Sequence, residues 1–586
     1  MTAAGGLHTR WALELMRGLR DAGAGWVVVS PGSRSTPLAL AAVEVFGASS
    51  TVVVDERSAA FVALGFARVA GAPAVMIVTS GSAGAHAFPA VIEAELACVP
   101  LIVLTADRPM ELFDAGAPQT IDQHQLFGRH VRAAFEVGAP DESALPVLAR
   151  VAFRAVRSSL GPEPGPVHIN ARFRKPLEPI DEAAVSTAPP PVPDLFLGEH
   201  APSDRALAYV RAALSEAERP IIALGPLPFG GASRAGLERD LSAALGSLIR
   251  ATHLAVVAEV SGGVRVAVNE GVFALGVLAE ANALSAELAP DLILELGSPP
   301  VSSAYASIAA RARRRIVVSP RRAPDPHNSA TAFIEADPAR FARDLASMVP
   351  QSEAARAYTA RLRAVAVRCE GVIERELSAA DTATLGEPLV MRRVVAALPE
   401  HAVVMVGNSL AVRDLDVYAA NGITQTVLHQ RGASGIDGLI AGAVGARLAT
   451  PAEVPVVLLL GDVSAAHDVG SIALLRDVTS TLVVVVINNG GGRIFDALPV
   501  KQALADDKTF ERLFLTPQPA FLEGTAAAFG ASFARAASCQ ELGAALEQAL
   551  GSSQATLIEV STPHQIGKQQ RAKIRAALRG EVTRAD

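Results

Sequence analysis

Short apolar runs recur along the chain, and segments with apolar residues at helical spacing separate them. In the first part of the chain the runs lie at 26–30, 51–54, 74–79, 101–105 and 166–170. Runs of this length that are rich in β-branched residues are typical of buried parallel strands. The segments at 58–69 and 85–97 have the helical pattern. This alternation predicts a doubly wound α/β domain.

The same alternation returns twice. Apolar runs in the middle of the chain lie at 220–224, 255–260, 292–296 and 315–318. In the last part they lie at 402–406, 425–429, 456–460, 482–487 and 556–560. The fold class that we predict is therefore α/β, with three doubly wound domains that are each built on a parallel sheet.

Two segments that lack the apolar strand pattern separate these domains. A proline-rich stretch at 187–193 is typical of a stiff linker, and a polar, arginine-rich helical pattern at 352–377 precedes the last set of strands. We therefore expect a first domain at 1–186, a linker at 187–200, a central α/β domain at 201–350, a helical connector at 351–385 and a last domain at 386–586.

The last domain carries a candidate metal site. Asp462 follows one apolar run, and Asn489 follows the next one, 27 positions later. Parallel strands joined by a right-handed crossover present such residues at one edge, where open α/β sheets bind ligands. Carboxylate and amide oxygens suit Mg²⁺, and the glycine run lets the Gly491 carbonyl serve as a third ligand. Each of Asp462, Asn489 and Gly491, taken alone, could also be an ordinary turn residue at the end of a strand.

Glu56 is a second candidate, because it follows the run at 51–54 and opens a helical pattern. A glutamate in the first turn of a helix also simply complements the helix dipole, which contributes about 0.3–1 kcal/mol. The pattern alone leaves both interpretations open.

Composition excludes several classes of protein. The chain has 586 residues and a net charge of −7, which argues against a nucleic-acid partner. No apolar run approaches the length that a membrane span needs, so we expect no membrane insertion. Three scattered cysteines and the absence of an evident secretory signal predict a cytoplasmic protein. Positive charge is almost entirely arginine, which binds carboxylates bidentately.

The segment from Gly461 to Asn489 resembles the signature of thiamin diphosphate enzymes, Gly-Asp-Gly followed by Asn-Asn, except that Val463 replaces the third residue. In these enzymes one α/β domain holds the diphosphate through Mg²⁺. A second domain, usually from the partner subunit, supplies a glutamate to the aminopyrimidine. The resemblance implies that Glu56 is this glutamate, with Mn²⁺ as the alternative metal, in at least a homodimer or a homotetramer with sites between subunits.

Five further motifs narrow the resemblance. They lie at 29–38, 79–83, 105–109 with 116–120, 407–413 and 431–438. Together they resemble the 2-succinyl-5-enolpyruvyl-6-hydroxy-3-cyclohexene-1-carboxylate synthase family, which are transferases of menaquinone biosynthesis. The resemblance implies decarboxylation of 2-oxoglutarate and 1,4-addition of the succinyl carbanion equivalent to isochorismate. Both substrates are dicarboxylates, so the family's site needs fixed cations.

The resemblance also implies the roles of individual residues. Catalysis falls to Glu56, Gln119, Arg34 and Arg413. The cofactor would contact Glu56, Thr79, Ser80, Gly81, Ser409, Leu410, Gly435, Ile436, Asp462, Val463, Ser464, Asn489, Gly491, Ile494 and Phe495. The substrates would contact Ser33, Arg34, Arg108, Gln119, Ser409, Arg413, Arg431, Ile494, Phe495 and Leu498. The metal ligands would be Asp462, Asn489 and Gly491.

One departure from the family stands in the central domain, where Ser303 occupies a position that often holds lysine. Two alternatives stay open. Another thiamin diphosphate lyase, similar to acetolactate synthase, would bind FAD in the central domain and use pyruvate. A non-catalytic binding protein on the same scaffold would bind neither cofactor nor Mg²⁺ productively.

Overall fold

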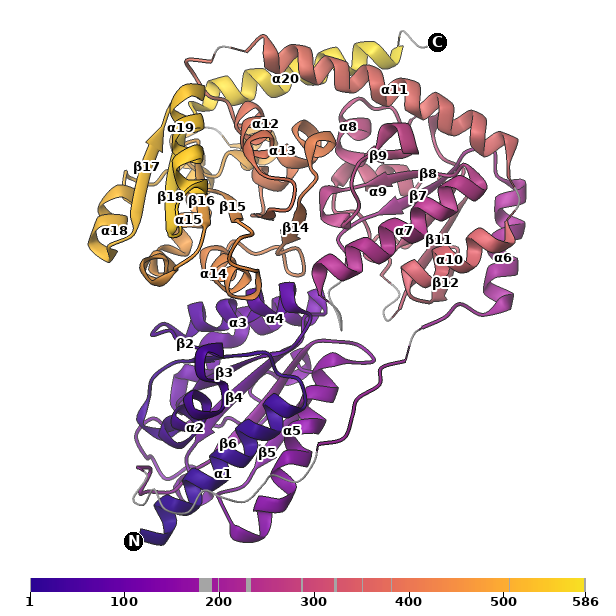
Figure 1. The fold of residues 1–586 in the computed structure, drawn as a ribbon. Helices are drawn as coiled ribbons and strands as arrows, with labels where there is room; N and C mark the ends of the chain where they lie inside the picture. The colour runs from indigo at the N-terminus through magenta and orange to yellow at the C-terminus, as the bar shows by residue number, and fades with distance from the viewer. Residues whose placement is uncertain are drawn as a thin grey trace.

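The computed structural model describes residues 2–178, 192–198, 200–227, 233–285, 288–320, 324–349, 351–380, 382–504 and 506–583. Each of three lobes is built on a parallel sheet, as the sequence predicts, and each sheet has six strands. The first lobe (2–178) lies below the middle lobe (200–349) and the third lobe (382–583), which stand side by side (Figure 1). The domain boundaries at 186, 200, 350 and 385 stay predictions, and residues 187–191 and 199 of the predicted linker lie outside the described residues.

The first sheet has the strand order β2-β1-β3-β4-β6-β5. Its strands are β1 (Trp26–Val29), β2 (Ser50–Val52), β3 (Ala74–Val78), β4 (Leu101–Asp107), β5 (Ala133–Val137) and β6 (Pro166–Arg172). Its helices are α1 (Thr2–Asp21), α2 (Thr36–Phe46), α3 (Glu56–Ala70), α4 (Phe88–Ala97) and α5 (Leu145–Leu160). The strand order reverses beside β1, so the loops after β1 and β3 flank a switch point where such sheets bind ligands.

The middle sheet has the order β12-β11-β10-β7-β8-β9. Its strands are β7 (Pro220–Leu224), β8 (Ala255–Ala258), β9 (Val272–Ala274), β10 (Leu292–Leu296), β11 (Arg314–Ser319) and β12 (Ala332–Glu335). Its helices are α6 (Asp204–Glu216), α7 (Arg234–Thr252), α8 (Leu275–Glu280), α9 (Ser303–Ala309) and α10 (Pro338–Met348). The long helix α11 (Glu353–Ser378) then leads to the third lobe and confirms the predicted helical stretch.

The third sheet repeats the first, in the order β14-β13-β15-β16-β18-β17. Its strands are β13 (Val403–Val406), β14 (Thr426–His429), β15 (Val456–Gly461), β16 (Leu482–Asn488), β17 (Ser532–Ala536) and β18 (Ala555–Ser561). Its helices are α12 (Glu387–Ala397), α13 (Leu410–Tyr418), α14 (Leu439–Ala449), α15 (Asp462–His467), α16 (Val500–Ala503), α17 (Asp507–Phe510), α18 (Leu522–Phe529), α19 (Cys539–Leu550) and α20 (His564–Thr583). Helices α20 and α11 run along each other above both upper lobes (Figure 1).

The crossover between β15 and β16 consists of two helical segments. Helix α15 ends at His467, and residues Val469–Asp477 form a 3₁₀ helix. Asp468 stands at the break, and its carboxylate accepts the backbone N–H groups of Ile440 at 2.8 Å and Ala441 at 3.2 Å. This side chain therefore caps helix α14 at the point where α15 ends.

Helices α3 and α14 join the first lobe to the third. They cross so closely that a Cβ atom at Gly65 would lie 2.0 Å from the Gly442 carbonyl oxygen, and one at Gly445 would lie 1.9 Å from the Val62 oxygen. Apolar residues from both sheets merge around this crossing into one buried cluster. The glycines are needed because any larger side chain would force the helix axes apart.

A buried ion pair supports the same contact. Arg68 of α3 pairs with Glu93 of α4, and both side chains are nearly inaccessible to solvent. The Glu93 carboxylate also accepts the backbone N–H groups of Gly432 at 3.0 Å and Ala433 at 2.6 Å. A carboxylate of the first lobe thus fixes a loop of the third lobe, next to Arg431.

We predict that Gly65→Ala lowers the free energy of unfolding by about 1–3 kcal/mol, because the added methyl group overpacks the helix crossing. Gly543→Ala is the matched control, since a Cβ atom there meets nothing within 4 Å and alanine favours a helix over glycine by about 1 kcal/mol. Thermal denaturation of both variants measures the difference. An equal rise in melting temperature for the two would contradict the close crossing.

Candidate active site

A cavity of about 540 Å³ opens at the carboxyl edge of the third sheet, beside the switch point between β13 and β15. Most residues that the sequence predicts for this lobe line it. They are Ser409, Leu410, Arg413, Arg431, Ile436, Asp462, Val463, Ser464, Asn489, Gly491, Ile494, Phe495 and Leu498. Gly435 lies just behind the wall, where its carbonyl accepts a hydrogen bond of 2.7 Å from the Asn408 amide.

The predicted metal ligands meet at the ends of two neighbouring strands, because Gly461 pairs with Ile487 in the ladder. Asp462 is 3% exposed, and burial raises the pKa of its carboxyl group. Its Oδ2 atom accepts a hydrogen bond of 2.7 Å from the Gly491 backbone. The Asn489 Nδ2 atom donates to Glu387 at 2.9 Å, whereas its Oδ1 atom is buried without a hydrogen-bond partner. A buried oxygen of this kind beside a carboxylate fits a hard cation.

Gly491 has a backbone conformation that suits its predicted role. Its φ angle is +115°, and a Cβ atom would lie 2.2 Å from the Leu515 carbonyl oxygen, so only glycine fits. Its carbonyl accepts one hydrogen bond of 2.7 Å from the Arg493 backbone. A carbonyl oxygen has a second lone pair, which leaves it able to bind a cation. Among the described residues, no group of three or more His, Cys, Asp or Glu side chains forms a metal site.

Two arginines bring positive charge to the same cavity. Arg413 donates to the Ser409 carbonyl at 2.6 Å, and Arg431 donates to Asn408 Oδ1 at 3.1 Å. Burial lowers the pKa of Arg431, and Glu259 opposes this shift. Ser409 has a φ angle of +67°, a strained conformation for a residue with a side chain. Such strain just after β13 is typical of a functional loop.

The residues predicted in the first lobe form a second cluster at the edge of their own sheet. Arg108 donates to Ser80 Oγ at 2.8 Å and to the Pro118 carbonyl at 2.9 Å, beside Gln119 with its φ angle of +53°. Arg34 is buried, and its Nε atom has no hydrogen-bond partner. Burial and then the charge of Arg108 lower the pKa of Arg34. Two cations held this close fit an anionic ligand.

The other predicted residues of the first lobe surround these arginines in the loops after β1 and β3. Ser33 precedes Arg34 in the 3₁₀ turn of Ser33–Ser35. A Cβ atom on Gly32 would lie 2.3 Å from the Thr79 side chain, and one on Gly81 would lie 3.4 Å from Gln119. The two loops therefore touch, and they bring the predicted substrate residues of this lobe together.

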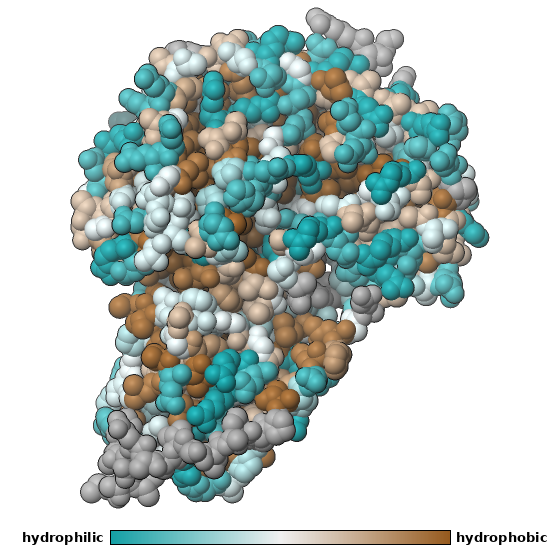
Figure 2. Space-filling view, in the orientation of Figure 1, coloured by the Kyte–Doolittle hydropathy of each residue, from teal (hydrophilic) through white to brown (hydrophobic). Residues whose placement is uncertain are grey.

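The two clusters do not meet within one chain. Among the described residues, those that line the third-lobe cavity all come from the middle and third lobes. Glu56 begins α3, where the Asp55 carboxylate caps the helix by accepting from Arg57 at 2.9 Å. Apolar side chains stand exposed close by in the sequence, with Val54 81% and Val52 61% accessible. Figure 2 shows apolar surface on the first lobe where it approaches the upper lobes.

Sequence reasoning missed several residues of the cavity. Glu387, Met391, Asp414 and Arg493 line it, yet none stands in a motif that pointed to it. Glu387 precedes Asn489 by 102 positions and opens helix α12, so only the folded chain brings the two together.

A smaller cavity of about 260 Å³ adjoins the main one at Val301, Arg413 and Arg431. Ser303, at the position where the family often has lysine, lies in it. Arg575 and Arg579 of α20 line the same cavity, so the C-terminal helix places two arginine side chains in the cavity that contains Ser303. Arg575 is paired with Glu280 of the middle lobe.

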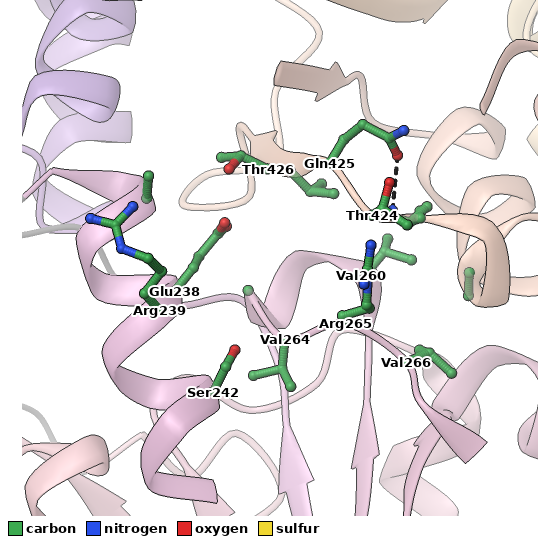
Figure 3. A pocket seen from close by; sticks show the side chains of 15 residues that line it. Glu238, Arg239, Ser242, Val260, Val264, Arg265, Val266, Thr424, Gln425 and Thr426 are labelled. Carbon is green, nitrogen blue, oxygen red and sulfur yellow. Dashed lines mark hydrogen bonds between the residues drawn. The ribbon is translucent and has the colours of Figure 1, made fainter. Parts of the chain in front are cut away.

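Another cavity, of about 360 Å³, lies between α7 and the start of β14 (Figure 3). Its partly buried carboxylate, Glu238, is held by Arg234 at 2.7 Å, and none of the predicted site residues lines it. It is therefore separate from the candidate active site.

None of the helices in the described ranges combines the length and apolar character that crossing a bilayer needs.

Two protein-family models match the chain. The thiamine pyrophosphate enzyme N-terminal TPP binding domain matches residues 11–126, and the thiamine pyrophosphate enzyme C-terminal TPP binding domain matches residues 414–560. These segments contain, respectively, the first-lobe cluster with Glu56 and the metal-ligand set of Asp462, Asn489 and Gly491.

Relatives with one name align over nearly the whole chain. A 2-succinyl-5-enolpyruvyl-6-hydroxy-3-cyclohexene-1-carboxylate synthase of Sorangium cellulosum is 42% identical, over 98% of this chain and 96% of the relative. Proteins of the same name from Chlorobium phaeobacteroides and Halobacterium salinarum are each 36% identical and cover at least 98% of both chains. The chain therefore belongs to the 2-succinyl-5-enolpyruvyl-6-hydroxy-3-cyclohexene-1-carboxylate synthase family of thiamine pyrophosphate enzymes.

Proposed function

We propose that this protein is a transferase that decarboxylates 2-oxoglutarate and adds the succinyl unit to isochorismate in a 1,4-addition. The products are 2-succinyl-5-enolpyruvyl-6-hydroxy-3-cyclohexene-1-carboxylate and CO₂, without release of pyruvate, and the step belongs to menaquinone biosynthesis. The observation that carries the proposal is one cavity that combines Asp462 and Asn489 with Arg413 and Arg431. Such a cavity suits a metal-bound diphosphate next to a carboxylate substrate.

Thiamin diphosphate and Mg²⁺, or Mn²⁺ in its place, are the proposed cofactors. Asp462, the Asn489 amide oxygen and the Gly491 carbonyl would hold the metal ion. Ser409, Leu410, Gly435, Val463 and Ser464 would surround the diphosphate, while Ile436, Ile494 and Phe495 would contact the rings. When bound, thiamin diphosphate supplies the electron sink that decarboxylation of a 2-oxoacid requires.

The roles that we propose for the remaining residues are those that the resemblance to the family implies. Glu56, helped by Thr79, Ser80 and Gly81 in positioning the pyrimidine, would exchange a proton at its ring nitrogen. Ser33, Arg34, Arg108 and Gln119 would bind isochorismate, and Ser409, Arg413, Arg431 and Leu498 would bind the succinyl and enolpyruvyl groups. Loss of one buried arginine would strand a carboxylate and cost about 2–5 kcal/mol of binding free energy.

We further propose that the active unit is at least a homodimer, in which the Glu56 edge of one chain covers the Asp462 cavity of another. The exposed side chains of Val52 and Val54 support this arrangement, because exposed apolar surface of this kind marks contact sites. Either a dimer or a tetramer satisfies the requirement, and the expected location is the cytoplasm.

The two alternatives are not favoured. The acetolactate-synthase-like alternative gives no reason for Arg34, Arg413 and Arg431 together. The non-catalytic alternative gives no reason for the unpartnered Asn489 oxygen beside a buried carboxylate.

The reaction is tested by supplying 2-oxoglutarate, isochorismate, thiamin diphosphate and Mg²⁺ and identifying the product by mass spectrometry. We expect the coupled product, and we expect none when pyruvate replaces 2-oxoglutarate, since pyruvate lacks the second carboxylate that the arginines would bind. Removal of Mg²⁺ with a chelator should stop turnover. Turnover of pyruvate, or none at all with 2-oxoglutarate, would reject the proposed reaction.

The shared site is tested by mixing two inactive variants. Glu56→Gln and Asp462→Ala should each lower activity by at least about 10²-fold while leaving the fold intact. Random reassembly of equal amounts would create mixed dimers with one intact site, and about a quarter of the wild-type activity should return. A site built within one chain would keep one defect in every active site, so the mixture would stay inactive.

A further inference from the structure

Glu387 makes a contact that decides which way the Asn489 side chain faces. Its Oε1 atom accepts the hydrogen bond of 2.9 Å from Asn489 Nδ2. A carboxylate only accepts hydrogen bonds, so the NH₂ end of the amide must face it. The opposite end, Oδ1, is the buried atom without a partner. With the amide reversed, its oxygen would lie against the carboxylate of Glu387 and its NH₂ group would face the proposed metal.

The Glu387 carboxylate is itself fixed by the C-terminal helix. Glu387 is 1% exposed, and its Oε1 atom lies 3.2 Å from Arg571 Nη2 of α20. Arg571 also binds Asp414, with its Nε atom 2.9 Å from Oδ1, and Asp414 lines the cavity from α13. One guanidinium therefore bridges two buried carboxylates and joins α20 to helices α12 and α13.

The lack of a side chain at Gly567 of α20 leaves room for the Glu387 carboxylate. A Cβ atom on Gly567 would lie 1.4 Å from Glu387 Oε2, so any side chain at this position must displace the carboxylate. Gly567 and Arg571 are one helical turn apart and face the same carboxylate.

We propose that Glu387 is the positioning residue that holds the Asn489 amide with its oxygen toward the metal, and that Arg571 and Gly567 of the C-terminal helix hold Glu387 in place. The inference rests on the proposed function, because it concerns the metal that anchors the diphosphate. Mutation of a residue that orients a metal ligand typically lowers metal affinity by about 10–100-fold. Helix α20 is thereby part of the cofactor site, although none of its residues would touch the cofactor.

The test measures thiamin diphosphate binding to the full-length protein by calorimetry, without substrate, at increasing Mg²⁺ concentration. Glu387→Ala should raise the Mg²⁺ concentration for half-maximal binding by about 10–100-fold. Glu387→Gln keeps a side-chain oxygen that can accept from Asn489, so it should restore part of the affinity. A role confined to folding would change the melting temperature in chelator without this shift or this rescue.

Gly567→Ala tests the same point without removing a polar group, and it should raise the Mg²⁺ requirement by displacing the carboxylate. Gly580→Ala is the control on the same helix, because a Cβ atom there meets nothing within 4 Å. If Glu387→Ala fails to fold, Glu387→Gln and Gly567→Ala decide the question.

The outcomes separate the two proposals. If the wild-type chain binds thiamin diphosphate and Glu387→Gln, Gly567→Ala and any folded Glu387→Ala share its Mg²⁺ dependence, the positioning role is wrong and the proposed function stands. If the wild-type chain binds no thiamin diphosphate at any Mg²⁺ concentration, the proposed function fails and the positioning role fails with it.

Discussion

The Asn489 side-chain oxygen is buried beside Asp462, and no hydrogen atom of the described chain satisfies it. A buried acceptor without a partner costs about 1–3 kcal/mol, and a bound cation removes this cost. Neighbouring groups hold the side chains of Asp462 and Asn489 in place. Gly491 donates to Asp462, and Glu387 takes the NH₂ end of the Asn489 amide. Oxygen atoms therefore face the point where β15 and β16 end, as the proposed metal site requires.

The rest of the fold keeps these groups in register. Parallel pairing of β15 with β16 brings Asp462 and Asn489 to one edge, and the close crossing of α3 with α14 ties the first lobe to the loop that carries Ile436. Glu93 adds two hydrogen bonds to the same loop beside Arg431. The chain therefore holds a cavity at the third sheet and a separate, cationic edge with Glu56 at the first. In the proposed dimer each of these is half of a site, and a second copy of the chain supplies the other half.

The central strands of each sheet were predictable because both of their faces are buried, which leaves continuous apolar runs in the sequence. The edge strands β5, β9, β12 and β17 were missed, because β9 spans only three residues and each of the other three contains exposed residues, so none forms such a run. The residues of the candidate site divide in the same way, into those that can be predicted from the sequence and those that cannot. Asp462 and Asn489 follow strands and could be found from spacing, whereas Glu387 acts through a contact between segments 102 positions apart, which only folding creates. The break after α15 depends on a capping contact of Asp468 with another helix.

The central claim is that one chain anchors the cofactor while another activates it. The most direct measurement is a cryo-electron microscopy structure of the assembled protein with thiamin diphosphate and Mg²⁺. We expect the diphosphate of each cofactor to lie at Asp462 of one chain. The Glu56 carboxylate of another chain should then lie within about 2.6–3.2 Å of the pyrimidine ring of that cofactor. A structure in which every Glu56 lies far from every cofactor would contradict it.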